Sequence, residues 1–166
     1  TCERILATTR RMIAKHGVKL VAIDYVQLVS PSGGKDTTRE QEVSVISRSI
    51  KSLARSLNVA VLALCQLNRQ VEYGTHTTYK NSHLRDSGSL EQDADVIAFI
   101  HRPSVAARGQ VDREQYQVLL DSDPAFAQKC QIHVTKQRNG PVGCIELAAD
   151  PDRMTFVEYD DAAPHI

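Results

Sequence analysis

The sequence predicts an α/β fold, with a mostly parallel sheet flanked by helices and an antiparallel β-hairpin appended near its C-terminal end. Continuous apolar runs, typical of strands covered on both faces, occur at residues 20–23, 59–64 and 96–100. Segments with the apolar spacing of a helix precede the first run and separate it from the second. Two further strand-like runs, residues 131–135 and 145–148, flank an Asn-Gly turn and indicate the hairpin.

Two long helices are expected. The first covers residues 3–16 and ends at Gly17. The second begins at Thr37, which has Glu40 three residues later in a capping-box pattern, and runs to Leu57. Its apolar face comprises Val43, Ile46, Ile50, Leu53, Ala54 and Leu57.

Composition and charge narrow the class of protein. The chain has 166 residues, one domain or a large part of one, with the 42% hydrophobic and 24% charged fractions of an ordinary soluble protein. Its 20 basic and 20 acidic residues cancel, which excludes a globally basic nucleic-acid binder and restricts any DNA contact to local patches. No apolar run could cross a bilayer, so we expect no membrane partner. The four cysteines lack a CxxC pair and are expected to be reduced thiols in the cytoplasm.

Asp24 and Gln66 each end a buried apolar run. Ligands of open α/β sheets bind beyond the carboxyl ends of the strands, so both side chains are expected at one site if these strands are neighbours. An acid there can hold Mg²⁺ through water, although it could equally cap the strand end. An uncharged amide can donate to a γ-phosphate and lose that bond on hydrolysis. The alternative for Gln66 is a solvated loop amide.

The run LRDSGSLEQDADVI, residues 84–97, places Arg85 and a Ser-Gly turn before an apolar strand. Gly88 permits close backbone approach, and exposed main-chain amides with one Arg suit phosphate oxygens. The chain has no Trp, and its five Tyr and three Phe do not cluster in these loops. A base-stacking platform is therefore not expected. We expect sequence-independent, salt-sensitive contact with a nucleic-acid backbone.

Lys136 and Arg138 alternate just before the Asn-Gly turn, so a strand would put both side chains on one face. Two like charges so placed suit an anion, and the alternative is two solvated hairpin charges. Cys130 and His133 have C-x₂-H spacing, but a strand points them to opposite faces. Because no second ligand pair has zinc spacing, a zinc site is rejected.

Four blocks resemble, in order, the motor domain of the replicative hexameric DNA helicases, the DnaB family: LVAIDYVQLV, VLALCQLNR, the run at residues 84–97, and VTKQRNGPVG. The resemblance covers residues 4–148. It implies a RecA-like P-loop NTPase fold that uses ATP and Mg²⁺. It further implies a homo-oligomeric hexamer that moves 5′ to 3′ on single-stranded DNA during replication, with primase and a helicase loader as further partners.

The resemblance also implies residue roles at the nucleotide site. Asp24 would hold Mg²⁺, and Gln66 would sense nucleotide state with help from Arg69. Cys65 stands where the family usually has Ser, a change that leaves the Gln66 assignment intact. Lys136 and Arg138 would reach the neighbouring subunit's nucleotide, with Arg138 as an arginine finger.

On the DNA side, the resemblance implies a loop that lines the central channel and grips one strand. This loop consists of Arg85, Asp86, Ser87 and Gly88. Asp86 stands where Glu is common and is expected to position its neighbours rather than touch DNA. Lys35 and Arg39, from the loop that follows the first strand, are candidates for the same channel.

The phosphate loop G-x-x-x-x-G-K-[ST] does not occur in the sequence, and the nearest string, GGKD at 33–36, lacks the spacing and the hydroxyl. In the family this loop and the catalytic Glu precede the block containing Asp24. We therefore expect residues 1–166 to be the C-terminal portion of a motor domain, inactive alone as an ATPase. Residues 104–129, charged, partly helical and broken by Pro124, are expected to be a surface insertion.

Two alternatives remain open. One is a non-catalytic oligomerisation or DNA-binding module derived from a RecA-like ATPase, which the absent phosphate loop favours. The other is a different RecA-like ATPase, a recombinase or a clock-type hexamer, which would share Asp24 and the strand pattern. Recombinases lack the DSG-x-x-EQDAD and KQRNGP strings, so this second alternative ranks lower.

Overall fold

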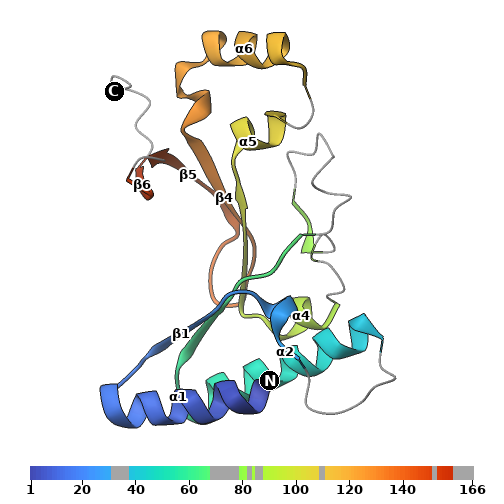
Figure 1. Cartoon of the computed structure of the whole chain (residues 1–166), viewed down its shortest axis with the longest axis vertical. Helices are drawn as coiled ribbons and strands as arrows, with labels where there is room; N and C mark the ends of the chain where they lie inside the picture. The colour runs from blue at the N-terminus through green and yellow to red at the C-terminus, as the bar shows by residue number, and fades with distance from the viewer. Residues whose placement is uncertain are drawn as a thin grey trace. The chain divides into compact units, whose positions relative to one another are not determined.

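The computed structural model describes residues 1–30, 38–67, 79–81, 84, 88–108, 111–150 and 153–158 (Figure 1). The chain divides into two compact units. Unit 1 comprises Thr1–Asn68 and Asn81–Ala94, and unit 2 comprises Arg69–Lys80 and Asp95–Ile166.

Two helices dominate unit 1. Helix α1 spans Cys2–His16 and ends, as predicted, at Gly17, which adopts the left-handed conformation with φ 65°. The Gly17 N–H donates to the Ile13 carbonyl at 2.8 Å and so satisfies one carbonyl of the last turn. Helix α2 spans Arg39–Leu57 and buries Val43, Ile46, Ser47 and Leu53.

The start of α2 differs from the prediction by one residue. The N-cap is Thr38, not Thr37: the Thr38 hydroxyl accepts from the Gln41 N–H, and the Gln41 side chain accepts from the Thr38 N–H at 3.0 Å. A threonine with a suitable partner three residues later occurs twice in overlapping register, as Thr37–Glu40 and as Thr38–Gln41. Spacing alone does not distinguish the two. Thr37 itself lies outside the described residues.

Strands β1 (Leu20–Ile23) and β2 (Ala60–Ala63) form a parallel pair in unit 1, with Ile23 opposite Ala63. Both helices pack on one face of this pair, and the short helix η1 (Val26–Leu28) completes the core. That core contains Ile23, Val26, Val29 and Ile46, with Cys2, Ile5, Val21, Ile50, Val61, Ala63 and Cys65 packed around it.

The other face of the β1–β2 pair is exposed, with Leu20 at 58% and Leu62 at 52%. The expectation that these strands are covered on both faces is therefore wrong for the described part of the chain. Its physical reason is that α1 and α2 lie on the same face of the pair.

Unit 2 contains an antiparallel sheet of order β3-β4-β5-β6. Its strands are β3 (Val96–His101), β4 (Lys129–Gln137), β5 (Gly143–Asp150) and β6 (Thr155–Glu158). The expected hairpin is the β4–β5 pair, and the α/β class with parallel strands, helices and an antiparallel hairpin is confirmed. Within the described ranges the parallel pairing is that of β1 with β2, because β3 pairs antiparallel with β4.

The connection between β3 and β4 contains helices α5 (Pro103–Arg108) and α6 (Arg113–Ser122) and the short helix η3 (Pro124–Ala127), as Figure 1 shows. Pro124 starts η3 and so ends the α6 segment, as expected of a residue without an N–H donor. The Ser104 hydroxyl donates to the Ala127 carbonyl at 3.1 Å and so joins α5 to η3. Of the helices that the structure describes, none is long and apolar enough to span a bilayer.

Candidate functional site

The carboxyl ends of β1 and β2 form the candidate nucleotide-binding edge. The strands are joined beyond their last pair, since Leu64 N–H donates to the Ile23 carbonyl at 3.0 Å and Val26 N–H donates to the Leu64 carbonyl at 2.9 Å. An open pocket of about 300 Å³ lies at this edge, lined by Asp24, Tyr25, Leu64, Cys65 and Gln66. The structure thus brings together the two strand-end residues that the sequence singled out.

The polar groups of this pocket fit a hydrated divalent cation and a phosphate. Asp24 is exposed, and its carboxylate oxygens are ligands of the kind that Mg²⁺ accepts directly or through water. Gln66 is also exposed and supplies an amide donor without a net charge. Burial raises the pKa of the Cys65 thiol to about 11, so this side chain stays neutral at physiological pH and adds no charge to the pocket.

Gln27 fixes the main chain of Gln66, a role that the sequence did not reveal. Its side-chain Nε2 donates to the Gln66 carbonyl at 3.3 Å, and its Oε1 accepts from the Gln66 N–H at 3.4 Å. Both bonds engage the backbone of Gln66 rather than its side chain. The two glutamines are 39 residues apart, so only the fold reveals the pair.

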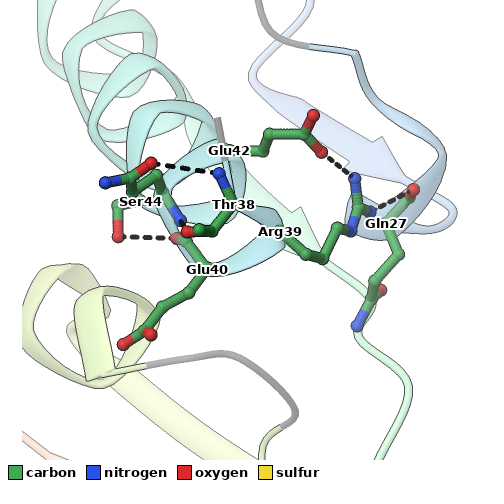
Figure 2. Close-up of polar contacts among 7 residues, drawn as sticks. Gln27, Thr38, Arg39, Glu40, Glu42 and Ser44 are labelled. Atoms are coloured by element: carbon green, nitrogen blue, oxygen red, sulfur yellow. Dashed lines mark hydrogen bonds and ion pairs between the residues drawn. The ribbon is translucent and has the colours of Figure 1, made fainter. Parts of the chain in front are cut away.

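Arg39, predicted to face a DNA channel, is the first residue of α2 and reaches back to η1 (Figure 2). Its Nη2 donates to the Gln27 carbonyl at 2.6 Å, and its Nη1 forms a 2.7 Å ion pair with Glu42. The Arg39 side chain remains 39% exposed. The structure therefore places this guanidinium in a network that joins the end of β1 to α2, and its contact with DNA stays a prediction.

Most of the predicted DNA-contacting residues, and Arg69 of the predicted nucleotide site, lie outside the described part. Arg69, Lys35, Arg85, Asp86 and Ser87 are not described, whereas Gly88 begins helix α4 (Gly88–Asp93). Among the described residues, nothing lies within 4 Å of a Cβ built on Gly88.

Helix α4 is attached to α2 by hydroxyl groups. Ser47, only 3% exposed, donates to the Asp93 carboxylate at 2.6 Å. The hydroxyls of Ser44 and Ser89 share a hydrogen bond. The residues that follow the predicted DNA loop are thus held on the same helix that Arg39 begins.

In unit 2, Lys136 and Arg138 lie where β4 meets its turn. Lys136 pairs with Ile97 next to a shift in the β3–β4 register, and Arg138 is the first residue after the strand. The Arg138 N–H donates to the Asp95 carbonyl at 2.9 Å, and its Nη1 lies 3.5 Å from the Asp95 carboxylate. The Arg138 and Asp95 side chains are 46% and 61% exposed, so this is a surface ion pair.

Comparison with known proteins gives a consistent result over nearly the whole chain. The family model of the DnaB-like helicase C terminal domain matches residues 1–158. The replicative DNA helicase DnaB of Geobacillus stearothermophilus is 40% identical over 156 residues, which cover 94% of this chain and 31% of that protein. The replicative DNA helicase DnaC of Bacillus subtilis is 40% identical over 164 residues, covering 96% of this chain and 33% of that protein.

Solved structures of similar fold lead to the same family. A DnaB-like replicative helicase that interacts with primase superimposes with a TM-score of 0.79 at 34% identity, covering 96% of this chain and 36% of that one. A solved ATPase domain gives the same TM-score and identity, covering 96% of this chain and 52% of that one. The chain spans about a third of the length of the curated relatives it matches.

Proposed function

The chain belongs to the DnaB-like helicase C-terminal domain family, and we propose that it forms part of the ATP-driven motor of a replicative DNA helicase. In this proposal the complete protein works as a hexameric ring that moves 5′ to 3′ along single-stranded DNA. The observation that carries the proposal is the shared pocket of Asp24 and Gln66 at the carboxyl ends of paired parallel strands. Open α/β sheets bind their ligands at this position.

At the nucleotide, the exposed carboxylate of Asp24 would hold Mg²⁺. The bound ion would offset the negative charge of the ATP phosphates. Gln66 donates its amide to the γ-phosphate and loses that bond on hydrolysis, and Arg69 assists. Gln27 holds the Gln66 backbone. A main-chain movement that accompanies loss of the Gln66 side-chain bond is therefore transmitted to Gln27 and to the elements attached to it.

At the DNA, the loop of Arg85, Asp86, Ser87 and Gly88 grips one strand through main-chain amides and the Arg85 guanidinium, while Asp86 orients that guanidinium. Lys35 adds a further cation. Contacts of this kind are tolerant of sequence and weaken steeply with salt.

Between subunits, Arg138 serves as an arginine finger and Lys136 lies beside it on the phosphates of the neighbouring nucleotide. The exposed ion pair with Asp95 is weak enough to exchange for a phosphate partner. Similarity to a helicase that interacts with primase makes primase a candidate partner, together with a helicase loader, in the cytoplasm.

The test uses the full-length protein, because this sequence contains no G-x-x-x-x-G-K-[ST] string and we expect no hydrolysis by the chain alone. Asp24→Asn removes the carboxylate charge, and we expect ATP hydrolysis on single-stranded DNA and unwinding of a 5′-tailed fork both to fall at least about 100-fold. The matched control is Asp121→Asn, which removes an exposed carboxylate on α6 and should leave both rates unchanged.

A wild-type rate in Asp24→Asn would contradict the role of Asp24. Wild-type protein that binds single-stranded DNA and oligomerises without hydrolysing ATP would instead support the non-catalytic module. Unwinding of a 3′-tailed fork in preference to a 5′-tailed one would overturn the proposed direction.

A further inference from the structure

Helix α2 is attached at its N-terminal end to the nucleotide-binding edge and along its length to the helix that follows the DNA loop. We propose that α2 couples nucleotide state to DNA grip, with Gln27 and Arg39 as positioning residues at one junction and Ser47 at the other. The proposal rests on the function proposed above and identifies residues through which its two sites communicate.

The first junction joins Gln66 to α2 in two steps. The Gln27 side chain holds the Gln66 backbone with two hydrogen bonds. The Gln27 carbonyl accepts from Arg39 at 2.6 Å (Figure 2). Glu42, one turn along α2, holds the other arm of the same guanidinium at 2.7 Å. Hydrogen bonds from a charged donor are roughly twice as strong as neutral ones. The planar guanidinium of Arg39 therefore fixes the orientation of the Gln27 carbonyl relative to α2 as well as the distance between them.

The helix between the junctions is suited to move as one body. A capping box centred on Thr38 closes its start, and Asn58 with φ 50° closes its end. Its core side buries Val43 and Ile46, which are 1% and 0% exposed. From Arg39 to Ser47 an α-helix rises roughly 12 Å. A displacement of its first turn is thus carried over this distance rather than absorbed.

The second junction joins α2 to α4. Ser47 is buried and bonds the Asp93 carboxylate at 2.6 Å, and the Ser44 and Ser89 hydroxyls are bonded one turn earlier. The Ser47 hydroxyl also lies 3.4 Å from the Ser89 carbonyl, so both of its partners belong to α4. A hydrogen bond to a charged acceptor such as the Asp93 carboxylate is stronger than a neutral one. A shift of α2 therefore moves α4, and with it Gly88, the last residue of the predicted DNA loop.

A second connection runs from the same edge to the same loop. Leu67, next to Gln66, forms a main-chain β-bridge with Leu84, next to Arg85. This bridge does not depend on the side chains of Gln27, Arg39 or Ser47. Loss of the α2 route is therefore expected to weaken the coupling without abolishing it.

The experiment measures the affinity of the full-length protein for a labelled single-stranded oligonucleotide, once with a non-hydrolysable ATP analogue and once with ADP. The ratio of the two affinities is the coupling factor. We expect Arg39→Gln and Gln27→Ala each to lower this ratio at least about fivefold. Ser47→Ala should lower it similarly, and the Arg39→Gln/Ser47→Ala double variant should fall little further, because both interrupt one route.

Two controls separate positioning from charge and from stability. Arg48→Gln removes an exposed cation from the same helix and should leave the ratio unchanged. Arg39→Lys keeps the charge but cannot span Gln27 and Glu42, so it should behave like Arg39→Gln. Melting temperature and ring assembly, measured on each variant, show whether the fold is kept.

Ratios that stay at the wild-type value in both Arg39→Gln and Gln27→Ala would overturn the proposal. A loss of affinity equal with both nucleotides, restored by Arg39→Lys, would also overturn it, because it would identify Arg39 as a direct phosphate contact. A wild-type ratio near one would overturn the proposed nucleotide-driven motor itself. These outcomes are distinguishable, since the first two require a large wild-type ratio.

Discussion

The His101 imidazole lies in an aromatic cluster of unit 2. Its Nδ1 shares a 2.6 Å hydrogen bond with the Tyr79 hydroxyl. The Tyr79 ring stacks on the Phe99 ring, with 5.2 Å between the ring centroids. Burial, and next the repulsion from His133, lower the pKa of His101 below its ordinary 6.5. The sequence does not indicate this cluster, because Tyr79 lies 22 residues before His101 and outside the helices and strands, whereas His101 ends β3.

This lowered pKa predicts a loss of stability in acid. The unfolded chain binds the proton more readily than the folded one, so the stability is fully present above pH 6.5 and declines as the pH falls toward the lower folded-state pKa. Thermal unfolding from pH 7.5 to 5 should show this decline, and His101→Gln should reduce it. His16→Gln, at the exposed end of α1, is the control and should retain it. Equal slopes for wild type and His101→Gln would contradict the assignment.

Arg138 likewise has a partner that is distant in sequence and that the sequence did not reveal. Its position before the Asn-Gly turn indicated an anion partner, but Asp95, 43 positions earlier, was not identified as that partner. An exposed ion pair at 3.5 Å contributes about 0–1 kcal/mol to stability. It therefore restrains the Arg138 guanidinium only weakly, and a phosphate could replace Asp95 as its partner.

At the scale of elements, periodicity located the helices and strands well because the signals are local. Helix α1 ends at the predicted glycine, and β1 has the predicted bounds. Which faces of the strands are buried was predicted less well. The run 96–100 within β3 is apolar throughout, yet Val96 and Ile100 are 55% and 63% exposed while Ile97 and Phe99 are buried. Apolar composition does not reveal which face receives a partner.

The cap of α2 can be tested directly. Thr38→Ala removes the acceptor for the Gln41 N–H and should lower the free energy of unfolding by about 1 kcal/mol. Thr37→Ala is the matched control, since the cap bonds belong to Thr38, and it should have a smaller effect. Urea unfolding of both variants measures the difference. A larger loss in Thr37→Ala would restore the register predicted from the sequence.

At the scale of the whole molecule, the sequence predicted the family and the strand-end position of Asp24 and Gln66, because both depend on contiguous motifs. It did not predict how those motifs are joined. The Gln27–Gln66 and Ser47–Asp93 contacts connect residues 39 and 46 positions apart, and such pairings are fixed only by tertiary packing. Whether residues 104–129 are an insertion stays a prediction.

In the proposed motor, this chain completes a nucleotide site that identical subunits share. The most direct test is ATP hydrolysis, with single-stranded DNA, by full-length Arg138→Ala mixed at varied ratios with a variant disabled at the phosphate-loop lysine of the complete protein. Each variant alone should be reduced about 10³-fold or more. In mixed rings about a quarter of the interfaces combine an intact phosphate loop with an intact Arg138, so activity should reappear and peak near equal amounts. Wild-type hydrolysis by Arg138→Ala alone, or no recovery at any ratio, would show that Arg138 does not act on the nucleotide of a neighbouring subunit.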